Sequence, residues 1–171
     1  MKRLLSLLLL LGSLWAAGAA PAQAQSMGSL VTFGQGELSI ETAKGDNHDF
    51  QVEIAETSEQ RAQGLMFRRQ MAGDAGMLFL FGGSKERAMW MKNTFIPLDM
   101  LFIDEAGEIV RIEQRTVPQS LRAIVSGQPV SAVLELNAGT TSRLGINPGD
   151  PPCVQLKTVP GNVFIDRIVR P

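Results

Sequence analysis

Three polar side chains interrupt a long apolar stretch of this sequence. "RAMWMKNTFIPLDMLFID", residues 87–104, contains Lys92, Asn93 and Asp99 among aliphatic, aromatic and methionine side chains. A buried carboxylate without a partner costs several kcal/mol or stays protonated, so we expect Asp99 to have a cationic or backbone N–H partner. A pairing of Lys92 with Asp99 is the simplest solution. The competing partners are Arg61, Arg68 and Arg143.

Glu135 is a second carboxylate inside an apolar segment. In "AVLEL" it shares a strand face with Val133, because successive side chains of a strand point to opposite faces. An arginine is a candidate partner here as well. Two interpretations stay open: Asp99 and Glu135 are satisfied carboxylates that fix strand register and loop positions, or they belong to a polar pocket. The candidate ligand-binding residues of that pocket are Arg61, Arg68, Trp90, Lys92, Asn93, Asp99 and Glu135.

Other catalytic and metal-binding arrangements find little support in the sequence. His48 is the only histidine and Cys153 the only cysteine, so there is no zinc-ligand spacing, no internal disulfide and no evident Ser/His or Cys/His nucleophile. Met89 and Met91 are expected on one strand face beside Trp90, and thioethers suit Cu(I). We favour core filling for these methionines, because they stand among leucine and phenylalanine. The sequence indicates no cofactor and no resident metal.

The elements that position these residues are mainly strands. In "PLDMLFID", Leu98, Met100 and Phe102 are predicted on one face, and Asp99 with Leu101 and Ile103 on the other. The remaining predicted strands are "ELSIET" and "HDFQVEIAET", which form a hairpin around Gly45, then "GMLFLF", "RAMWMK", the edge strand "EIVRIEQRT", "PVSAVLELN" and "CVQLKT".

Two short helices complete the prediction. Thr57 or Ser58 is expected to cap a helix in "SEQRAQGLM", with Gln60 in capping-box position. A helical turn in "AGTTSRLG" is expected to be capped by Asn137 or Thr140 and to end at Gly145. Without βαβ alternation, the fold class is mainly β: an antiparallel β-sandwich or barrel-like domain with two short helical segments.

Residues 1–24 have the pattern of a secretory signal peptide. Lys2 and Arg3 precede a short apolar run, and Ala22 and Ala24 fit the small-x-small cleavage pattern. We expect a linker over residues 25–36, a single β-rich domain over 37–171, and a periplasmic or secreted protein without a membrane association after cleavage. The formal net charge is −1 and no basic stripe occurs, which argues against nucleic acid as a partner.

The motifs also carry a family resemblance. "VEIAETSEQRAQGLMFRR", "GMLFLF", "WMKNTFIPLDMLFID" with "GEIVRI", "AVLELNAG" and "GINPGD" occur in the order typical of domain of unknown function 192, so the sequence resembles that family from about Leu38 to Thr158. The resemblance implies a small, often exported bacterial or archaeal protein with a compact β-sandwich-like fold. It implies no established activity, cofactor or catalytic residue. Its signature positions include Arg61, Arg68, Trp90, Lys92, Asn93, Asp99 and Glu135.

From these features we favour an exported, non-catalytic binding or accessory module for a small polar or anionic ligand, a glycan or a peptide in the cell envelope. One alternative is a hydrolase or lyase of an envelope polymer that uses Asp99 or Glu135 as acid or base, with Lys92 or Arg68 for electrostatic stabilisation. The least favoured alternative is a methionine-based Cu(I) carrier.

Overall fold

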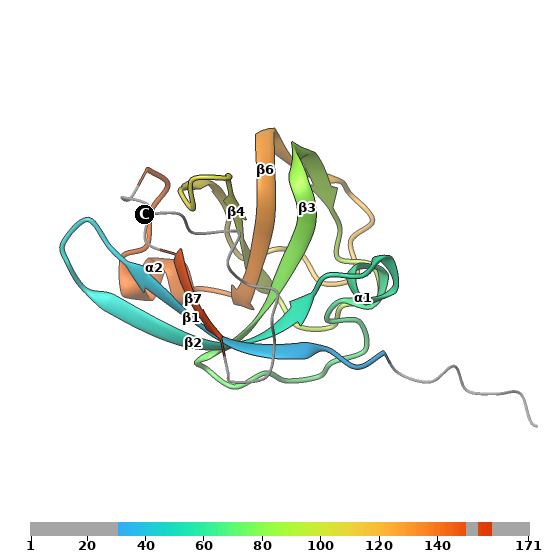
Figure 1. Ribbon diagram of the computed structural model, residues 1–171. Coiled ribbons are helices and arrows are strands. Elements are labelled where there is room, and N and C mark those ends of the chain that lie inside the picture. Colours follow the sequence, from blue (N-terminus) through green and yellow to red (C-terminus); the bar gives the residue numbers. More distant parts are fainter. Residues whose placement is uncertain (1–30, 150–153, 159–171) are drawn as a thin grey trace, which may run out of the picture. The chain divides into compact units, whose positions relative to one another are not determined.

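One curved β-sheet and two short helices make up the domain in the computed structural model, which describes residues 31–149 and 154–158 (Figure 1). The sheet has seven strands in the order β5-β4-β6-β3-β2-β1-β7. It is not a closed barrel, and the prediction of a mainly β fold with two short helices is confirmed. The elements are β1 (Gly34–Glu41), β2 (Asn47–Ala55), α1 (Ser58–Gln63), β3 (Ala75–Met89), β4 (Leu98–Ile103), β5 (Ile109–Glu113), β6 (Ile124–Asn137), α2 (Thr140–Leu144) and β7 (Val154–Thr158).

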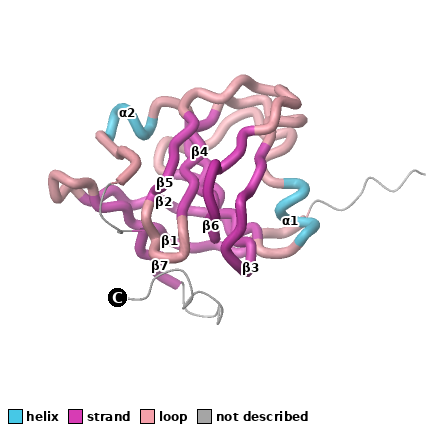
Figure 2. Tube along the Cα trace, turned by 90° about the horizontal axis from the view of Figure 1, so that it is seen from above, coloured by secondary structure: helices cyan, strands magenta, loops and turns pink. Residues whose placement is uncertain are grey.

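All neighbouring strands pair antiparallel except β2 and β3, which are parallel and are connected through α1. The predicted β1–β2 hairpin is confirmed, with Gly45 in its turn at a φ of 83°. The predicted edge position of β5 is confirmed too, since β5 is the last strand of the sheet and pairs with β4. In Figures 1 and 2, α1 and α2 lie at opposite ends of the sheet.

Each face of the sheet carries its own apolar core. The first core contains Leu101, Ile103, Leu134 and Leu136 together with side chains from β1, from β2 and from the end of α2 and the residues that follow it. The second core contains Leu98, Met100, Phe102 and Val133 together with Leu65, Met77, Phe79 and Met91. The period-two assignment of β4 is therefore confirmed, because its alternate residues enter different cores.

Strand β3 differs from the prediction. The sequence indicated two strands separated by Gly82 and Gly83, but the structure has one strand over Ala75–Met89. Leu80 pairs with Ala132 and Lys85 with Val130, so the chain bulges between them, and both glycines have positive φ. The glycines thus permit a bulge rather than a reversal of direction. Because β3 ends at Met89, Trp90 and Lys92 follow the strand and do not share a strand face.

The first strand begins earlier than predicted, and several predicted features fall on residues that the structure does not describe. β1 begins at Gly34, so residues 34–36, expected in the linker, belong to the first strand. The predicted signal peptide, Cys153 and the segment 159–171 lie outside the described residues. The "CVQLKT" strand is confirmed over Val154–Thr158. Within residues 31–149 and 154–158, no helix has both the length and the apolar character that crossing a membrane requires.

The two helices begin in different ways. α1 has the predicted capping box, in which the Thr57 side chain accepts from the Gln60 backbone N–H and the Gln60 side chain accepts from the Thr57 N–H. α2 ends at Gly145 as predicted, but its N-cap is Gly139 and no side chain of its own caps it. The expectation that Asn137 or Thr140 caps α2 is wrong, because a carboxylate from a neighbouring strand takes that role.

Candidate functional site

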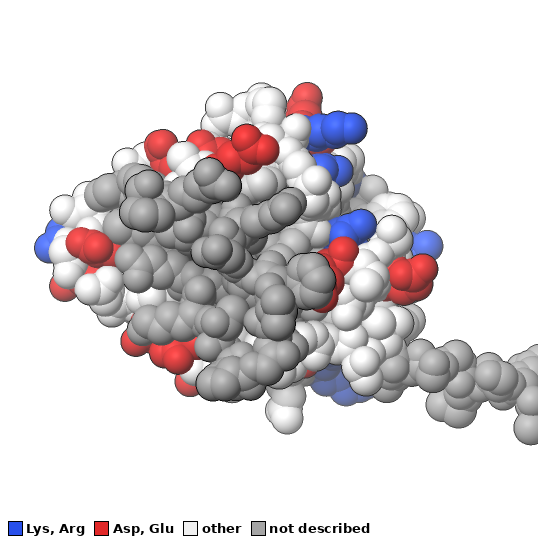
Figure 3. Space-filling model, in the orientation of Figure 1, with Lys and Arg blue, Asp and Glu red and all other residues white. Residues whose placement is uncertain are grey.

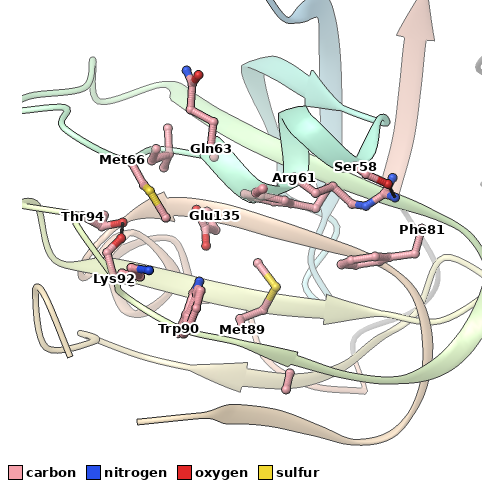
Figure 4. A pocket seen from close by; sticks show the side chains of 15 residues that line it. Ser58, Arg61, Gln63, Met66, Phe81, Met89, Trp90, Lys92, Thr94 and Glu135 are labelled. Carbon is pink, nitrogen blue, oxygen red and sulfur yellow. Dashed lines mark hydrogen bonds between the residues drawn. The ribbon is translucent and has the colours of Figure 1, made fainter. Parts of the chain in front are cut away.

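A cavity of about 370 Å³ opens between α1, β3 with the segment that follows it, and β6 (Figure 4). Aromatic rings and thioethers form much of its wall, and Figure 4 shows Glu135 in the middle of the lining. Its volume falls in the range of small-molecule pockets in proteins. The lining residues are Ser58, Arg61, Ala62, Gln63, Gly64, Leu65, Met66, Phe79, Phe81, Ala88, Met89, Trp90, Lys92, Thr94 and Glu135.

Glu135 is the buried ionisable group among the described residues that line this pocket. Its residue is 3% exposed, and β6 places it between Met77 of β3 and Met100 of β4. Burial raises the pKa of its carboxyl to about 8, so the group is mostly protonated at pH 7. Within the described part of the chain, the Glu135 carboxyl has no hydrogen-bond or ion-pair partner, and the candidate arginine partner of the sequence analysis is absent.

The two cations that line the pocket already have other partners. The Arg61 guanidinium donates to the backbone carbonyl of Glu56, to that of Leu80 at 2.9 Å, and lies 5.8 Å from the Phe81 ring centre. It thereby ties α1 to β3. Lys92 Nζ lies 5.1 Å from the centre of the Trp90 ring. Neither cation neutralises Glu135.

Glu135 is also the central member of a row of side chains that crosses five strands. On one side, Glu135 of β6 pairs with Met77 of β3, and Met77 pairs with Glu53 of β2. On the other side, Glu135 pairs with Met100 of β4, and Met100 pairs with Glu113 of β5. Paired positions point to the same face of a sheet, so the three glutamates all lie on the second-core face. We call them the glutamate row.

The outer members of the glutamate row are ion-paired. Arg68 pairs with Glu53. Arg111 and Arg122 pair with Glu113, at N–O distances of 2.6 and 2.9 Å. The central glutamate is thus the one member of the row without an arginine.

Asp99 lies on the opposite face, at the first core. Its carboxylate accepts from the backbone N–H of Arg115 at 2.9 Å, of Gly139 at 3.0 Å and of Thr141 at 3.0 Å, and from the Thr141 hydroxyl at 2.7 Å. Burial opposes ionisation of Asp99, but these hydrogen bonds lower its pKa below the usual value. The expected backbone N–H partner is confirmed, whereas the simple pairing with Lys92 is wrong, as are the three arginine alternatives.

The structure separates the sequence-predicted site residues into two groups. Arg61, Trp90, Lys92 and Glu135 line the pocket. The others do not line it: Arg68 pairs with Glu53, Asp99 caps α2, and Asn93, at a φ of 56°, directs its amide to the Met66 sulfur at 3.7 Å.

The aromatic wall of the pocket was not among the residues predicted from the sequence. Phe79 and Phe81 line the pocket, and period-two counting from Met77 puts both on the face of the glutamate row. That signal was present, but it becomes useful only when the strand "GMLFLF" is known to pair with "AVLEL".

The methionines divide between pocket and core. Met66 and Met89 line the pocket, whereas Met91 is fully buried in the second core with its sulfur 3.2 Å from the Thr116 hydroxyl oxygen. The expected Met89–Met91 strand face is therefore wrong. Among the residues described, no group of three or more histidine, cysteine, aspartate or glutamate side chains could hold a metal ion.

Comparisons with known proteins identify relatives of unknown biochemical activity. Residues 39–151 match the sequence pattern of DUF192, Uncharacterized ACR. The crystal structure of a proposed transcription regulator from Sinorhizobium meliloti 1021 is similar, with 50% identity and a TM-score of 0.71 over 74% of this chain and 97% of that chain. A protein of unknown function from Novosphingobium aromaticivorans DSM 12444 is 35% identical, with a TM-score of 0.67 over 84% and 99%. No curated protein matches this sequence.

Proposed function

The chain belongs to the DUF192 family, and we propose that it is a binding module that holds a small ligand in the pocket beside α1. The observation that carries the proposal is Glu135, a buried carboxyl that faces this pocket and has no partner among the described residues. Buried polar groups are nearly always hydrogen-bonded, so this carboxyl at the pocket is a candidate for a hydrogen bond from a ligand group.

The walls of the pocket favour binding over chemistry. α1 has its own capping box, and Arg61 fixes α1 to the Leu80 carbonyl of β3, so the cavity is preformed by regular elements. The lining combines an apolar wall with a few polar groups, which is the usual composition of small-molecule sites. A small polar ligand, one sugar unit or one peptide end matches the volume.

An extracytoplasmic location is part of this proposal. Residues 1–24 carry the basic start, apolar run and small-x-small end of a secretory signal. Fractionation of cells that produce the chain with a C-terminal tag should place it outside the cytoplasm with Gln25 as its first residue. A cytoplasmic protein that keeps Met1 would contradict the location.

We do not extend a role in transcription to this chain. Its formal net charge is −1, and DNA-binding domains normally carry a concentrated basic surface. On the face drawn in Figure 3, the visible acidic and basic side chains are interspersed.

A thermal-shift screen tests the proposal. The wild type is screened against amines, carboxylates, sugars and dipeptides, beside Ala88→Trp, which adds an indole at an exposed pocket-lining position of β3. We expect at least one compound class to raise the Tm of the wild type and not of Ala88→Trp. A screen in which no class stabilises the wild type, or in which both proteins respond equally, would overturn the proposal.

An enzymatic role for Glu135 alone is the second candidate. A pKa of about 8 suits a general acid or base near neutral pH. Asp99 cannot assist it, because the two carboxyls lie on opposite faces of the sheet. Release of fragments from envelope polysaccharide by the wild type but not by Glu135→Gln would favour this role, and equal release by both would exclude it.

A further inference from the structure

We infer that the ligand is a small organic cation, a primary ammonium or guanidinium group on a short apolar body, and that the Glu135 carboxylate binds its charged end. The inference rests on the proposed function, because it assigns the chemistry of the ligand to the same pocket.

The glutamate row supplies the first argument. Glu53 and Glu113, its outer members, are each neutralised by arginine from the same chain. Glu135 occupies the equivalent central position and has no cation of its own within the described residues. Adjacent strands are separated by about 4.8 Å, so a cation bound at Glu135 would lie about 10 Å from the arginines of the outer pairs. A ligand cation would therefore complete the pattern without displacing an existing ion pair.

The two cations of the described pocket lining each contact another group of the protein. Arg61 and Lys92 are the other ionisable side chains of the described pocket lining, and Arg61 donates to backbone carbonyls while Lys92 lies over the Trp90 ring. On the strands beside Glu135, the paired residues are the neutral Met77 and Met100. Once ionised, the Glu135 carboxylate is an acceptor only, which matches a charged donor on the ligand.

The walls define the remainder of the ligand. Phe79, Met66 and Met89 offer apolar and polarizable surface around the carboxyl. A cavity of about 370 Å³ accommodates a molecule with a single short chain or one ring, and excludes a folded partner.

The affinity for a cation should depend on pH, because the Glu135 carboxyl must be ionised to bind it. The Glu135 carboxyl is mostly protonated at pH 7 and must lose its proton to pair with a cation. Affinity for the cation should therefore rise about tenfold per pH unit below pH 8 and level off above it. A ligand that accepts a hydrogen bond from the protonated carboxyl would show the opposite dependence, with affinity falling above pH 8.

Isothermal titration of the full mature chain tests the inference. The probes are 2-phenylethylamine, agmatine, the neutral isostere 2-phenylethanol and the anionic 3-phenylpropionate, each at pH 6, 7 and 8.5. We expect one of the two cations to bind at least tenfold more tightly than the neutral and anionic probes, with affinity rising with pH and a proton released on binding below pH 8.

Two variants serve as a matched pair. Glu135→Gln keeps the shape of the side chain and removes its charge, so it should weaken cation binding at least tenfold and abolish the pH dependence. Glu53→Gln removes an outer member of the same row and should change binding less than twofold. The pH series on the wild type keeps the test valid if Glu135→Gln does not fold.

Three results would overturn the inference: tighter binding of the neutral or anionic probe, cation affinity that does not rise with pH, or equal cation binding by the wild type and Glu135→Gln. If neither cation binds while the thermal-shift screen finds a neutral or anionic ligand, the cation inference fails and the binding module stands. If no compound binds in either experiment, both fail.

Discussion

Asp99 and Glu135 lie on adjacent strands but on opposite faces of the sheet, and the pKa values of their carboxyl groups shift in opposite directions although both groups are buried. Both residues are at most 3% exposed. Four hydrogen-bond donors surround Asp99 and lower its pKa, whereas Glu135 has no such donors and its pKa is raised to about 8. The comparison teaches that the local supply of N–H and O–H groups, not burial itself, decides which buried acid is ionised.

The helices on the two faces of the sheet also differ in how their N-termini are capped. On the pocket side, α1 begins with its own capping box at Thr57 and Gln60. On the other side, α2 has no side-chain cap, and Asp99 accepts from the first N–H groups at its start. Asp99 thus performs a structural task for a helix about 40 residues further along the chain, which leaves it no role at the pocket.

The largest expected effect is the pH dependence of stability at Glu135. Its folded pKa is above its ordinary value of 4.5, so the stability it contributes is complete below pH 4.5 and is lost as pH rises towards about 8. Glu135→Gln lacks this loss and should exceed the wild type by up to about 5 kcal/mol above pH 8. Urea unfolding at pH 5, 7 and 9, with Glu53→Gln as control, measures the difference. If the free energies of unfolding of the wild type and Glu135→Gln change with pH by the same amount, the expected effect of the Glu135 carboxyl is contradicted.

Asp99→Ala should destabilise the domain by about 3–4 kcal/mol at pH 7, because it leaves buried N–H groups and the Thr141 hydroxyl without an acceptor. The pKa of Asp99 is lowered, so its contribution is present above the ordinary pKa and is lost as pH falls through the folded value. The difference in free energy of unfolding between Asp99→Ala and the wild type, measured with urea, should therefore become smaller in strong acid. A loss below 1 kcal/mol at pH 7 would show that the hydrogen bonds are not needed.

Thr141→Val separates the hydroxyl from the backbone donors of Asp99. It removes the 2.7 Å hydrogen bond to the carboxylate and keeps the shape of the side chain. We expect a loss of about 1.5 kcal/mol, within the range for hydrogen bonds to charged groups. Chemical denaturation provides the value, and Ser142→Ala on the exposed side of α2 is the control. If the two variants are equally stable, the hydroxyl does not support Asp99.

Thr57→Ala should have the smallest effect, about 1 kcal/mol, because it removes one side of the α1 capping box. The loss should appear locally as faster amide hydrogen exchange in α1 and leave exchange around α2 unchanged. Faster exchange at both helices would show that the two ends of the sheet are coupled rather than independent.

The sequence was sufficient for features that depend on neighbours along the chain. Alternation assigned Asp99 and Met100 to different faces, and the spacing of Thr57 and Gln60 located α1, because strand and cap geometry repeat at short range. It was insufficient for the partner of Asp99, since Thr141 lies 42 residues away. Lys92 was the nearest cation in sequence, and proximity in sequence was the wrong guide.

The site depended on strand order, which alternation does not specify. β6 lies between β3 and β4, and this placement alone brings Glu135 between Met77 and Met100 and aligns it with Glu53 and Glu113. The parallel pairing of β2 and β3 was likewise not evident, because α1 is much shorter than the crossover helices that normally mark parallel strands.

The pairing of β1 with β7 has a consequence for how the chain assembles. Gly36 pairs with Thr158 and Ile40 with Val154, so the edge of the sheet is complete only when segments more than 100 residues apart have met. Such non-local closure slows folding, and until it occurs β1 presents unpaired backbone groups that other chains can join. A chain ending before Val154 should therefore aggregate during refolding at protein concentrations at which the chain that includes β7 stays in solution.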